Sequence, residues 1–196
     1  AVDFYNPSAQ AAEATLSFRD VDLEGTIAVR DVFERKDEAA RTDGQMQVSV
    51  PGHGCRIYLL TATKRLERQR YEAETAYISD YQELWNNQAK KTGIYEYDDR
   101  CSAGMKATWL GCSTQNDLQW KHVYVNKAGK RTLSFKCLSP DKRQFTVSVN
   151  GTDVKTLTVD GNATVSLKVK LQKGDNIVRL YNEQTWMPDV DCMTVK

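Results

Sequence analysis

Short apolar–polar alternations, separated by turn signals, fill the second half of the chain and constrain its fold more than any other feature. The alternating segments are 118–125, 131–137, 144–149, 154–159, 163–169 and 176–181. A period of two is typical of antiparallel strands with one face in a core. Asn150-Gly151 joins two of the segments and favours a type I′ hairpin turn, because both residues tolerate positive φ. The region therefore predicts a β-sandwich of about eight or nine strands.

Residues 1–63 predict a second, smaller β-structure. Its strand-like runs, at 14–18, 25–30, 46–51 and 55–60, are separated by Gly, Asp and Pro. About four or five strands are marginal for independent folding. We therefore expect this region to be a small β-sandwich or half of one, and the chain to be a mature protein or an excised piece of a longer one.

The charged stretch 64–70 carries neither Gly nor Pro and is the predicted linker between residues 1–63 and a module at 71–196. The segment after it gives a conflicting signal. Tyr77, Tyr81, Leu84 and Trp85 have the i, i+4, i+7, i+8 spacing of an amphipathic helix, and residues 64–91 are rich in helix formers. The pattern alone favours a helix in this otherwise all-β chain.

Charge and hydropathy exclude several partners. The 27 basic and 26 acidic residues leave a net charge of +1, which argues against a nucleic-acid partner. No apolar run reaches the roughly 18 residues of a membrane span, so no membrane span is expected.

The five cysteines include no C-x-x-C pair, which leaves a zinc ribbon unsupported. One or two disulfides, in an exported protein, and buried free thiols remain open as alternatives.

The residues that commonly perform catalysis do not form a known constellation. His53 and His122 are the only histidines, and neither lies near a nucleophile elbow or a zinc motif. We expect His53 to be a turn residue and His122 to be a packed or half-exposed neighbour of the core. Acidic pairs such as Asp98-Asp99 do not supply two carboxyls held across a cleft, which glycoside hydrolysis requires. The chain is therefore expected not to be an enzyme.

A set of anchors in residues 71–196 resembles the β-sandwich carbohydrate-binding modules of families 6 and 35. These anchors are Tyr71-Glu-Ala-Glu74, Ser102-Ala-Gly104, Asn150-Gly151, Gly174-Asp-Asn-Ile-Val-Arg-Leu-Tyr-Asn182 and Met187-Pro-Asp-Val-Asp191. The resemblance implies a jelly-roll sandwich in which Tyr71 opens a strand, followed by loop with at most a helical turn. It also implies a structural calcium where the first and last strands meet. Glu72, Glu74 and Asp191 match its side-chain ligands, and backbone carbonyls would complete the shell.

The same resemblance implies a sugar site in loops at one end of the sandwich. Asn182 matches a late asparagine of that site, and Trp186 is expected in the loop that follows it. Trp85, Tyr95 and Tyr97 are expected to form the opposing wall. Aromatic rings suit this role because they offer rigid apolar surface to the CH face of a pyranose.

The remaining tryptophans carry weaker expectations. Trp120 alternates with Leu118 and is expected in the core, whereas Trp109 could be core or surface.

Residues 1–63 resemble the C-terminal β-domain of glycoside hydrolase family 27, which is mainly α-galactosidases. The matching segments are Val2-Asp-Phe-Tyr-Asn6, Thr26-Ile-Ala-Val-Arg-Asp-Val-Phe33, Lys36-Asp37, Val50-Pro-Gly-His-Gly54 and Arg56-Ile-Tyr-Leu59. In that family the domain packs behind a catalytic (β/α)8 barrel. The Lys-Tyr-Asp context of the nucleophile is absent from this sequence, so no catalytic residue carries over.

Together the two resemblances imply a non-catalytic accessory region of a secreted or periplasmic α-galactosidase-like hydrolase. Its partners would be a galactoside or plant polysaccharide and the upstream catalytic barrel of the same polypeptide. Two alternatives remain. The second module could be a purely structural packing element without a working sugar site, or the chain could contribute residues to a partner's active site.

Overall fold

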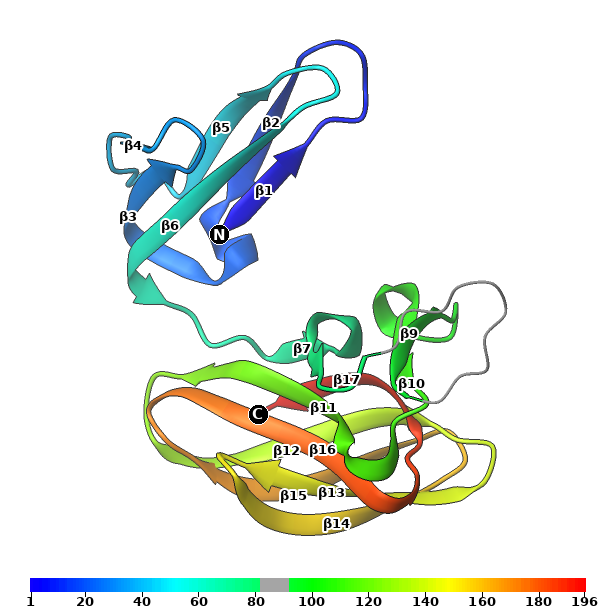
Figure 1. Ribbon diagram of the computed structural model, residues 1–196. Coiled ribbons are helices and arrows are strands. Elements are labelled where there is room, and N and C mark those ends of the chain that lie inside the picture. Colours follow the sequence, from blue (N-terminus) through cyan, green and yellow to red (C-terminus); the bar gives the residue numbers. More distant parts are fainter. Residues whose placement is uncertain (82–91) are drawn as a thin grey trace. The chain divides into compact units, whose positions relative to one another are not determined.

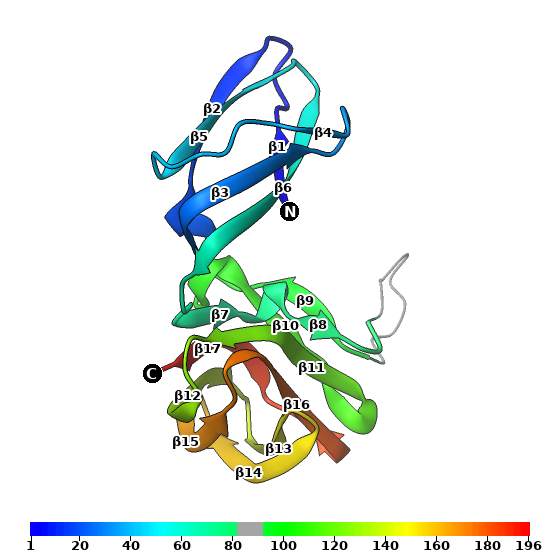
Figure 2. The same cartoon turned by 90° about the vertical axis from the view of Figure 1, so that its left-hand side faces the viewer.

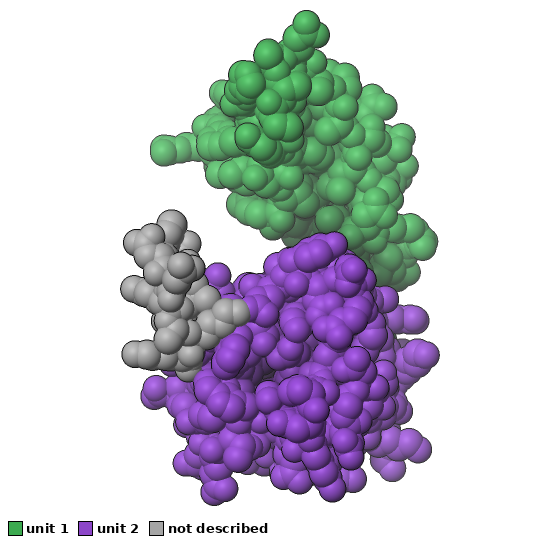
Figure 3. All heavy atoms as spheres, turned by 90° about the vertical axis from the view of Figure 1, so that its right-hand side faces the viewer, with its two compact units in different colours: residues 1–67 green, residues 68–196 purple. Residues whose placement is uncertain are grey.

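The computed structural model describes residues 1–81 and 92–196 and divides into two compact units. Unit 1 is Ala1–Glu67 and unit 2 is Arg68–Lys196 (Figure 3). Both are built almost wholly of strands, which confirms the all-β prediction. Among the described residues, no helical segment has the length and apolar character that crossing a bilayer would require.

Unit 1 is a small sandwich of two antiparallel sheets, ordered β1-β6-β3-β4 and β2-β5 (Figures 1 and 2). Its elements are β1 (Val2–Tyr5), β2 (Ala12–Ser17), the 3-10 helix η1 (Phe18–Val21), β3 (Leu23–Asp31), β4 (Lys36–Asp37), β5 (Gln45–Val50) and β6 (Cys55–Arg65). Alternate side chains of both sheets meet in one core with Phe18, Ile27, Met46 and Tyr58. His53 has φ +51° between β5 and β6, so its predicted turn position is confirmed.

Unit 2 is a larger sandwich of two sheets. One sheet runs β15-β12-β17-β10-β9, with β7 paired to β17, and the other runs β14-β13-β16-β11-β8. The elements are β7 (Arg70–Glu72), η2 (Ala73–Thr75), β8 (Tyr77–Ile78), β9 (Ile94–Tyr97), η3 (Ser102–Gly104), β10 (Met105–Thr108), β11 (Gly111–Val125), β12 (Gly129–Leu138), β13 (Lys142–Val149), β14 (Thr152–Asp160), β15 (Ala163–Leu171), β16 (Gly174–Trp186) and β17 (Asp189–Val195).

The core of unit 2 lies between these sheets. Trp120, Phe135 and Phe145 form an aromatic chain at its centre, with ring centroids 6.2 and 5.6 Å apart, and Trp120 is 3% exposed as expected for a core residue. Asn150 and Gly151 both have positive φ between β13 and β14, which confirms the predicted hairpin turn.

The structure corrects one expectation and decides between alternatives in two other cases. Tyr77 lies in strand β8, so the helix that its spacing alone favoured does not form at that point; Leu84 and Trp85 lie outside the described residues. His122 is exposed on β11 rather than packed or half-exposed, because it points away from the core that its neighbour Val123 enters. All five cysteines are free thiols and three of them are buried, so of the two alternatives for the cysteines the structure contains free thiols.

Candidate functional site

A strained turn at the start of β11 brings a tryptophan to the surface at one end of unit 2. Trp109 and Cys112 have positive φ, a conformation that costs an L-residue about 1–2 kcal/mol, and Gly111 between them adopts positive φ without that cost. The buried Asn116 side chain fixes this turn, since its amide donates to the carbonyls of Trp109 and Gly111, each at 2.8 Å. Its oxygen accepts the Gly93 N–H at 2.7 Å. Backbone strain that neighbouring groups hold in place is typical of functional sites.

This turn places Trp109 against Trp186. Gly111 pairs with Trp186 across β11 and β16, and the Met187 N–H donates to the Leu110 carbonyl at 2.8 Å. The two indole rings meet edge to face, with centroids 5.6 Å apart and an interplanar angle of 87°. Trp109 is 39% exposed and Trp186 is half-buried, so together they form an apolar corner open to solvent.

The corner is part of a groove of about 300 Å³, which we call the tryptophan groove. Its lining residues are Glu96, Thr108, Trp109, Pro140, Arg143, Trp186 and Asp189. A second depression of about 410 Å³ adjoins it, sharing Arg143 and Trp186 and otherwise lined by Asp141, Lys142, Gln144 and Thr185. Trp186 and Arg143 therefore border both hollows.

The charges along the groove wall are compensated by a network of ion pairs. Lys106 lies between Asp189, at 2.6 Å, and Asp98, at 3.3 Å, while Thr108 donates to the other Asp189 oxygen at 2.6 Å. Burial alone would lower the pKa of Lys106, but its hydrogen bond to Asp189 and the attraction of Asp98 raise it. The bidentate Arg100 guanidinium holds the pKa of Asp98 well below its usual range.

The guanidinium of Arg143 is likewise engaged, with Asp141 at 2.5 Å and the Met187 carbonyl at 3.1 Å. The groove thus offers apolar ring surface bordered by polar groups whose charges are balanced. That combination suits an uncharged ligand with an apolar face and hydroxyl edges.

Asn182 has a local role beside this groove and is not among its lining residues. Its amide donates to the Gln144 carbonyl at 2.9 Å and to Thr185 Oγ1 at 3.0 Å. Its oxygen accepts the N–H groups of Gln184 and Thr185. These bonds shape the end of β16, and Trp186 accordingly lies in that strand rather than in the predicted loop.

The other predicted aromatic residues do not line the groove. Tyr95 is half-buried, stacks on Tyr81 with centroids 5.6 Å apart and donates to the Ala76 carbonyl at 2.6 Å. Tyr97 is 76% exposed on the same strand, but the residue between them, Glu96, faces the tryptophan groove. Trp85 lies outside the described residues.

Sequence reasoning left Trp109 undecided and missed Glu96 and Arg143. One signal was present for Trp109: it stands immediately before Leu110-Gly111, upstream of the strand predicted at 118–125. Loops of this kind carry functional residues more often than strands do.

Two of the predicted metal ligands, Glu72 and Asp191, come together beside the Ser102 hydroxyl. Glu74 is near enough for their charges to raise its pKa, but it is not among the ligand atoms that lie within 4.8 Å of one another. We call Glu72, Glu74, Asp191 and the Ser102 hydroxyl the carboxylate corner. Glu72 and Asp191 come together because β7 pairs with β17. The Ser102 Oγ lies within hydrogen-bonding distance of a carboxylate oxygen of each, 2.7 Å in the case of Glu72. A hydroxyl has one hydrogen and cannot donate to both, so one of these two contacts lacks a donor.

The charges of the carboxylate corner are not balanced and favour a bound cation. Arg70 pairs with Glu72 and Lys136 with Asp191, each at 2.6 Å, which leaves one carboxylate uncompensated. That carboxylate is Glu74, whose buried Oε2 has no hydrogen-bond partner among the described residues. Burial raises the pKa of Glu74 above its ordinary value of 4.5, and the negative charges of Glu72 and Asp191 raise it further.

Oxygen donors of this kind fit calcium, which takes carboxylates together with backbone carbonyls. The Cys192 thiol lies within 4.8 Å of the Glu72 and Asp191 oxygens. Burial raises its pKa, so it remains a neutral, soft group unsuited to that ion.

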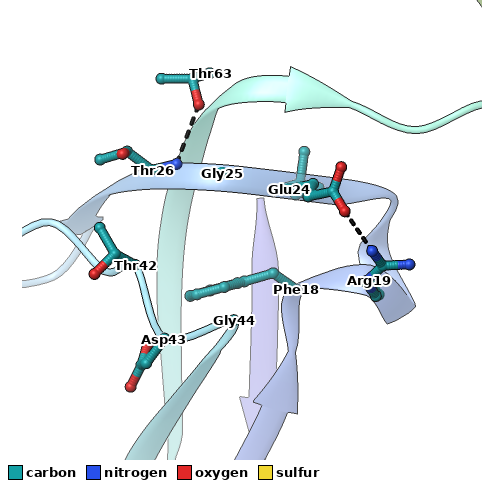
Figure 4. Close-up of a pocket in the computed structure, with 10 residues that line it drawn as sticks. Phe18, Arg19, Glu24, Gly25, Thr26, Thr42, Asp43, Gly44 and Thr63 are labelled. Carbon is teal, nitrogen blue, oxygen red and sulfur yellow. Dashed lines mark hydrogen bonds and ion pairs between the residues drawn. The ribbon is translucent and has the colours of Figure 1, made fainter.

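Unit 1 has a depression of its own, of about 510 Å³ (Figure 4). Thr26, Thr42, Asp43 and Thr63 surround it, and the Phe18 ring lies at its floor (Figure 4). Phe18 is only 1% exposed, so its ring offers no surface for stacking. Glu24 is neutralised by ion pairs with Arg19 and Lys64. This depression lacks the exposed aromatic surface that distinguishes the tryptophan groove.

Comparison with solved structures shows that the folds of both parts are familiar ones. A family 35 carbohydrate binding module from Clostridium thermocellum matches with a TM-score of 0.57 and 23% identity, over 64% of this chain and 96% of its own. CBM35 from Paenibacillus barcinonensis matches with a TM-score of 0.54 and 18% identity, over 66% of this chain and 98% of its own.

An isomalto-dextranase of Arthrobacter globiformis T6, solved with panose, covers 98% of this chain at a TM-score of 0.58 and 17% identity. This chain spans about a third (34%) of that enzyme. At these identities the similarity concerns the fold alone. It confirms the expected jelly-roll sandwich.

At the level of sequence, no curated protein matches the chain. Residues 1–60 match the alpha galactosidase C-terminal beta sandwich domain, which confirms the resemblance found in the first part of the sequence.

Proposed function

We propose that this chain is a non-catalytic accessory region of a secreted α-galactosidase-like glycoside hydrolase and that unit 2 binds carbohydrate in the tryptophan groove. The observation that carries this proposal is the exposed corner of Trp109 and Trp186, because a solvent-facing pair of indoles beside polar groups suits a pyranose ring. The match of residues 1–60 and the family 35-like fold support the assignment to a hydrolase.

Binding would hold the catalytic part of the same polypeptide on galactose-containing polysaccharide. A weak contact suffices for this purpose, since tethering raises the local concentration of substrate without any new catalytic group. Loss of the groove should therefore impair action on polymers and leave action on small soluble substrates unchanged.

Trp186→Ala should weaken retention of the purified chain on galactan and galactomannan at least tenfold, about 1.4 kcal/mol, because it removes one wall of the groove. Affinity electrophoresis through gels that contain each polysaccharide measures the effect. Tyr77→Ala is the matched control, since it truncates another exposed aromatic of unit 2, on β8.

Equal retention of both variants would reject the groove as the binding site. If the folded wild-type chain were not retained by any glycan of a broad panel, unit 2 would instead be a structural packing module.

We further propose that the carboxylate corner holds a structural calcium ion. Calcium at about 100 times its Kd should stabilise unit 2 against unfolding by about 2.7 kcal/mol. All four tryptophans lie after residue 67, so tryptophan fluorescence follows unit 2 alone during urea unfolding. Stability that is unchanged by calcium and by chelator would contradict the proposal.

The raised pKa of Glu74 gives this proposal a pH signature. Without metal, the folded state holds a proton on Glu74 above pH 4.5 that the unfolded chain has released. The stability that this group contributes is therefore present below pH 4.5 and is lost as pH rises through its folded pKa.

Glu74→Gln should accordingly gain stability relative to wild type as pH rises from 4.5 to 7 without metal, and lose that advantage when calcium is added. Urea unfolding at several pH values checks both steps. A constant difference between the two proteins would show that Glu74 is an ordinary surface carboxylate.

A further inference from the structure

The outward face of β12, β15 and the end of β17 carries a cluster of lysines, which we call the lysine face: Lys130, Lys168, Lys170 and Lys196. The register of the strands places them in two neighbouring rows. In one row, Lys130 lies directly opposite Lys170. In the other, Thr132 pairs with Lys168 on one side and exchanges backbone hydrogen bonds of 2.7 and 3.0 Å with Lys196 on the other.

All four side chains point away from the core, because Leu133, Leu167, Val169 and Val195 alternate with them and are buried. Each lysine is exposed, and none has an ion-pair partner among the described residues. No acidic side chain occupies these two rows. Like charges directly opposite one another destabilise a sheet, so this arrangement carries a cost that an anionic partner would remove.

Protection of the sheet edge explains only part of the cluster. β15 is an edge strand, and lysines on an edge discourage pairing with other chains. That accounts for Lys168 and Lys170, and it extends to Lys130, because the pairing of β12 with β17 begins only at Thr132. It does not account for Lys196, which follows β17, a strand that pairs with β12 on one side and with β7 on the other.

The rest of this face is rich in hydroxyls. Ser134 and Ser166, whose hydroxyls are 2.8 Å apart, and Thr194 form the next row. Beyond them, Thr164 pairs with Lys136 beside a depression of about 180 Å³ that Arg100 also lines. From Thr164 to Lys170 the face extends about 20 Å along the strand at roughly 3.3 Å per residue.

We propose that the lysine face binds an anionic polysaccharide, one with repeating carboxylate or sulfate groups. The lysines would form ion pairs with the anionic groups of such a chain, and the hydroxyls of the serine and threonine rows would form hydrogen bonds with its hydroxyls. Proteins that bind single-stranded nucleic acid combine cations with aromatic platforms. From Lys130 to Lys136 on β12, and along β15, every outward-facing residue is a lysine, serine or threonine, so the composition favours a polysaccharide.

The double variant Lys130→Gln/Lys168→Gln should bind polygalacturonate about tenfold more weakly than wild type at low salt. Affinity electrophoresis through gels that contain polygalacturonate measures this difference as reduced retention. Iota-carrageenan gels test sulfate in place of carboxylate. Lys121→Gln/Lys155→Gln removes the same charge from two exposed lysines of the other sheet and should bind as wild type does. Circular dichroism confirms that each variant is folded.

Two further arms decide the interpretation. Retention on neutral galactan should not change in the Lys130/Lys168 variant. Retention on the polyanions should not change in Trp186→Ala. Each variant therefore tests one of the two proposed sites, so either proposal can be rejected without the other. Any of three results rejects the lysine face as a polysaccharide site. The wild-type chain is not retained by either polyanion, the two double variants lose polyanion binding to the same extent, or the wild-type chain binds single-stranded DNA of equal charge as tightly as it binds the polyanions.

Discussion

Replacing Asn176 by alanine should lower the free energy of unfolding of unit 2 by about 3 kcal/mol, because several buried polar groups lose their partner at once. The side chain is fully buried. Its amide lies within hydrogen-bonding distance of the carbonyls of Val123, Gln172 and Gly174, at 3.2, 2.9 and 3.1 Å. Its oxygen accepts the Gln172 N–H and the Asn150 amide, each at 2.9 Å.

These bonds join three chain segments that would otherwise place polar backbone in the core. They connect the turn between β15 and β16, the bulge of β11 near Val123 and the Asn150-Gly151 hairpin. Urea unfolding followed by tryptophan fluorescence measures the loss in unit 2 without interference from unit 1, which contains no tryptophan.

Two variants calibrate the result. Asn162→Ala removes an exposed side chain with one bond of 3.3 Å and should cost less than about 0.5 kcal/mol. Asn176→Asp keeps the acceptor but buries a charge and loses the donor, so it should be at least as harmful as alanine. A cost for Asn176→Ala close to that of Asn162→Ala would show that the turns hold without it.

The sequence could predict the strands of unit 2 because their period-two patterns reflect a core between two sheets. Each of the six alternating segments lies within one strand, from β11 to β16. The pattern also predicted that Trp120 is buried. It did not indicate that Asn176 is buried, because the sequence pattern is the same for a buried, hydrogen-bonded asparagine and for an exposed one.

The groove could not be predicted because it depends on irregularities in pairing. Trp109 and Trp186 are far apart in sequence and meet where β11 pairs irregularly with β16, with register shifts between Gly111 and Ser113 and again before Leu118. Bulges of this kind interrupt the period on which sequence patterns rest. Residues 183–185 are polar, so their pattern predicts a loop, although β16 continues through them to Trp186.

The carboxylate corner was a different case. The resemblance to families 6 and 35 singled out Glu72, Glu74 and Asp191 before any geometry was known. The convergence of Glu72 and Asp191 follows from the β7–β17 pairing, which joins segments more than 100 residues apart and which no local pattern could indicate.

Gly111→Ala should be among the most damaging substitutions in unit 2, affecting both stability and binding. Gly111 has φ +99°, and an added Cβ would lie 2.4 Å from the Thr185 carbonyl oxygen, 2.9 Å from the Met187 nitrogen and 3.2 Å from the Trp186 Cα. All three atoms are backbone, so relief requires β16 to move away from β11 at the point where the two indoles meet. We expect a tenfold or greater loss of galactan retention together with destabilisation.

Gly151→Ala separates the clash from the cost of backbone conformation. Gly151 also has positive φ, +81°, but nothing lies within 4 Å of its Cβ position. Its alanine variant should therefore show only the conformational cost, about 1–2 kcal/mol, with binding intact. Gly111→Ala should exceed that cost by about 2 kcal/mol, since overpacking of this kind typically costs 1–3 kcal/mol. If the two variants were equally stable and Gly111→Ala still bound galactan, the close approach of β11 and β16 would not be what positions Trp186, and the groove would have to be supported by Asn116 and Asn182 alone.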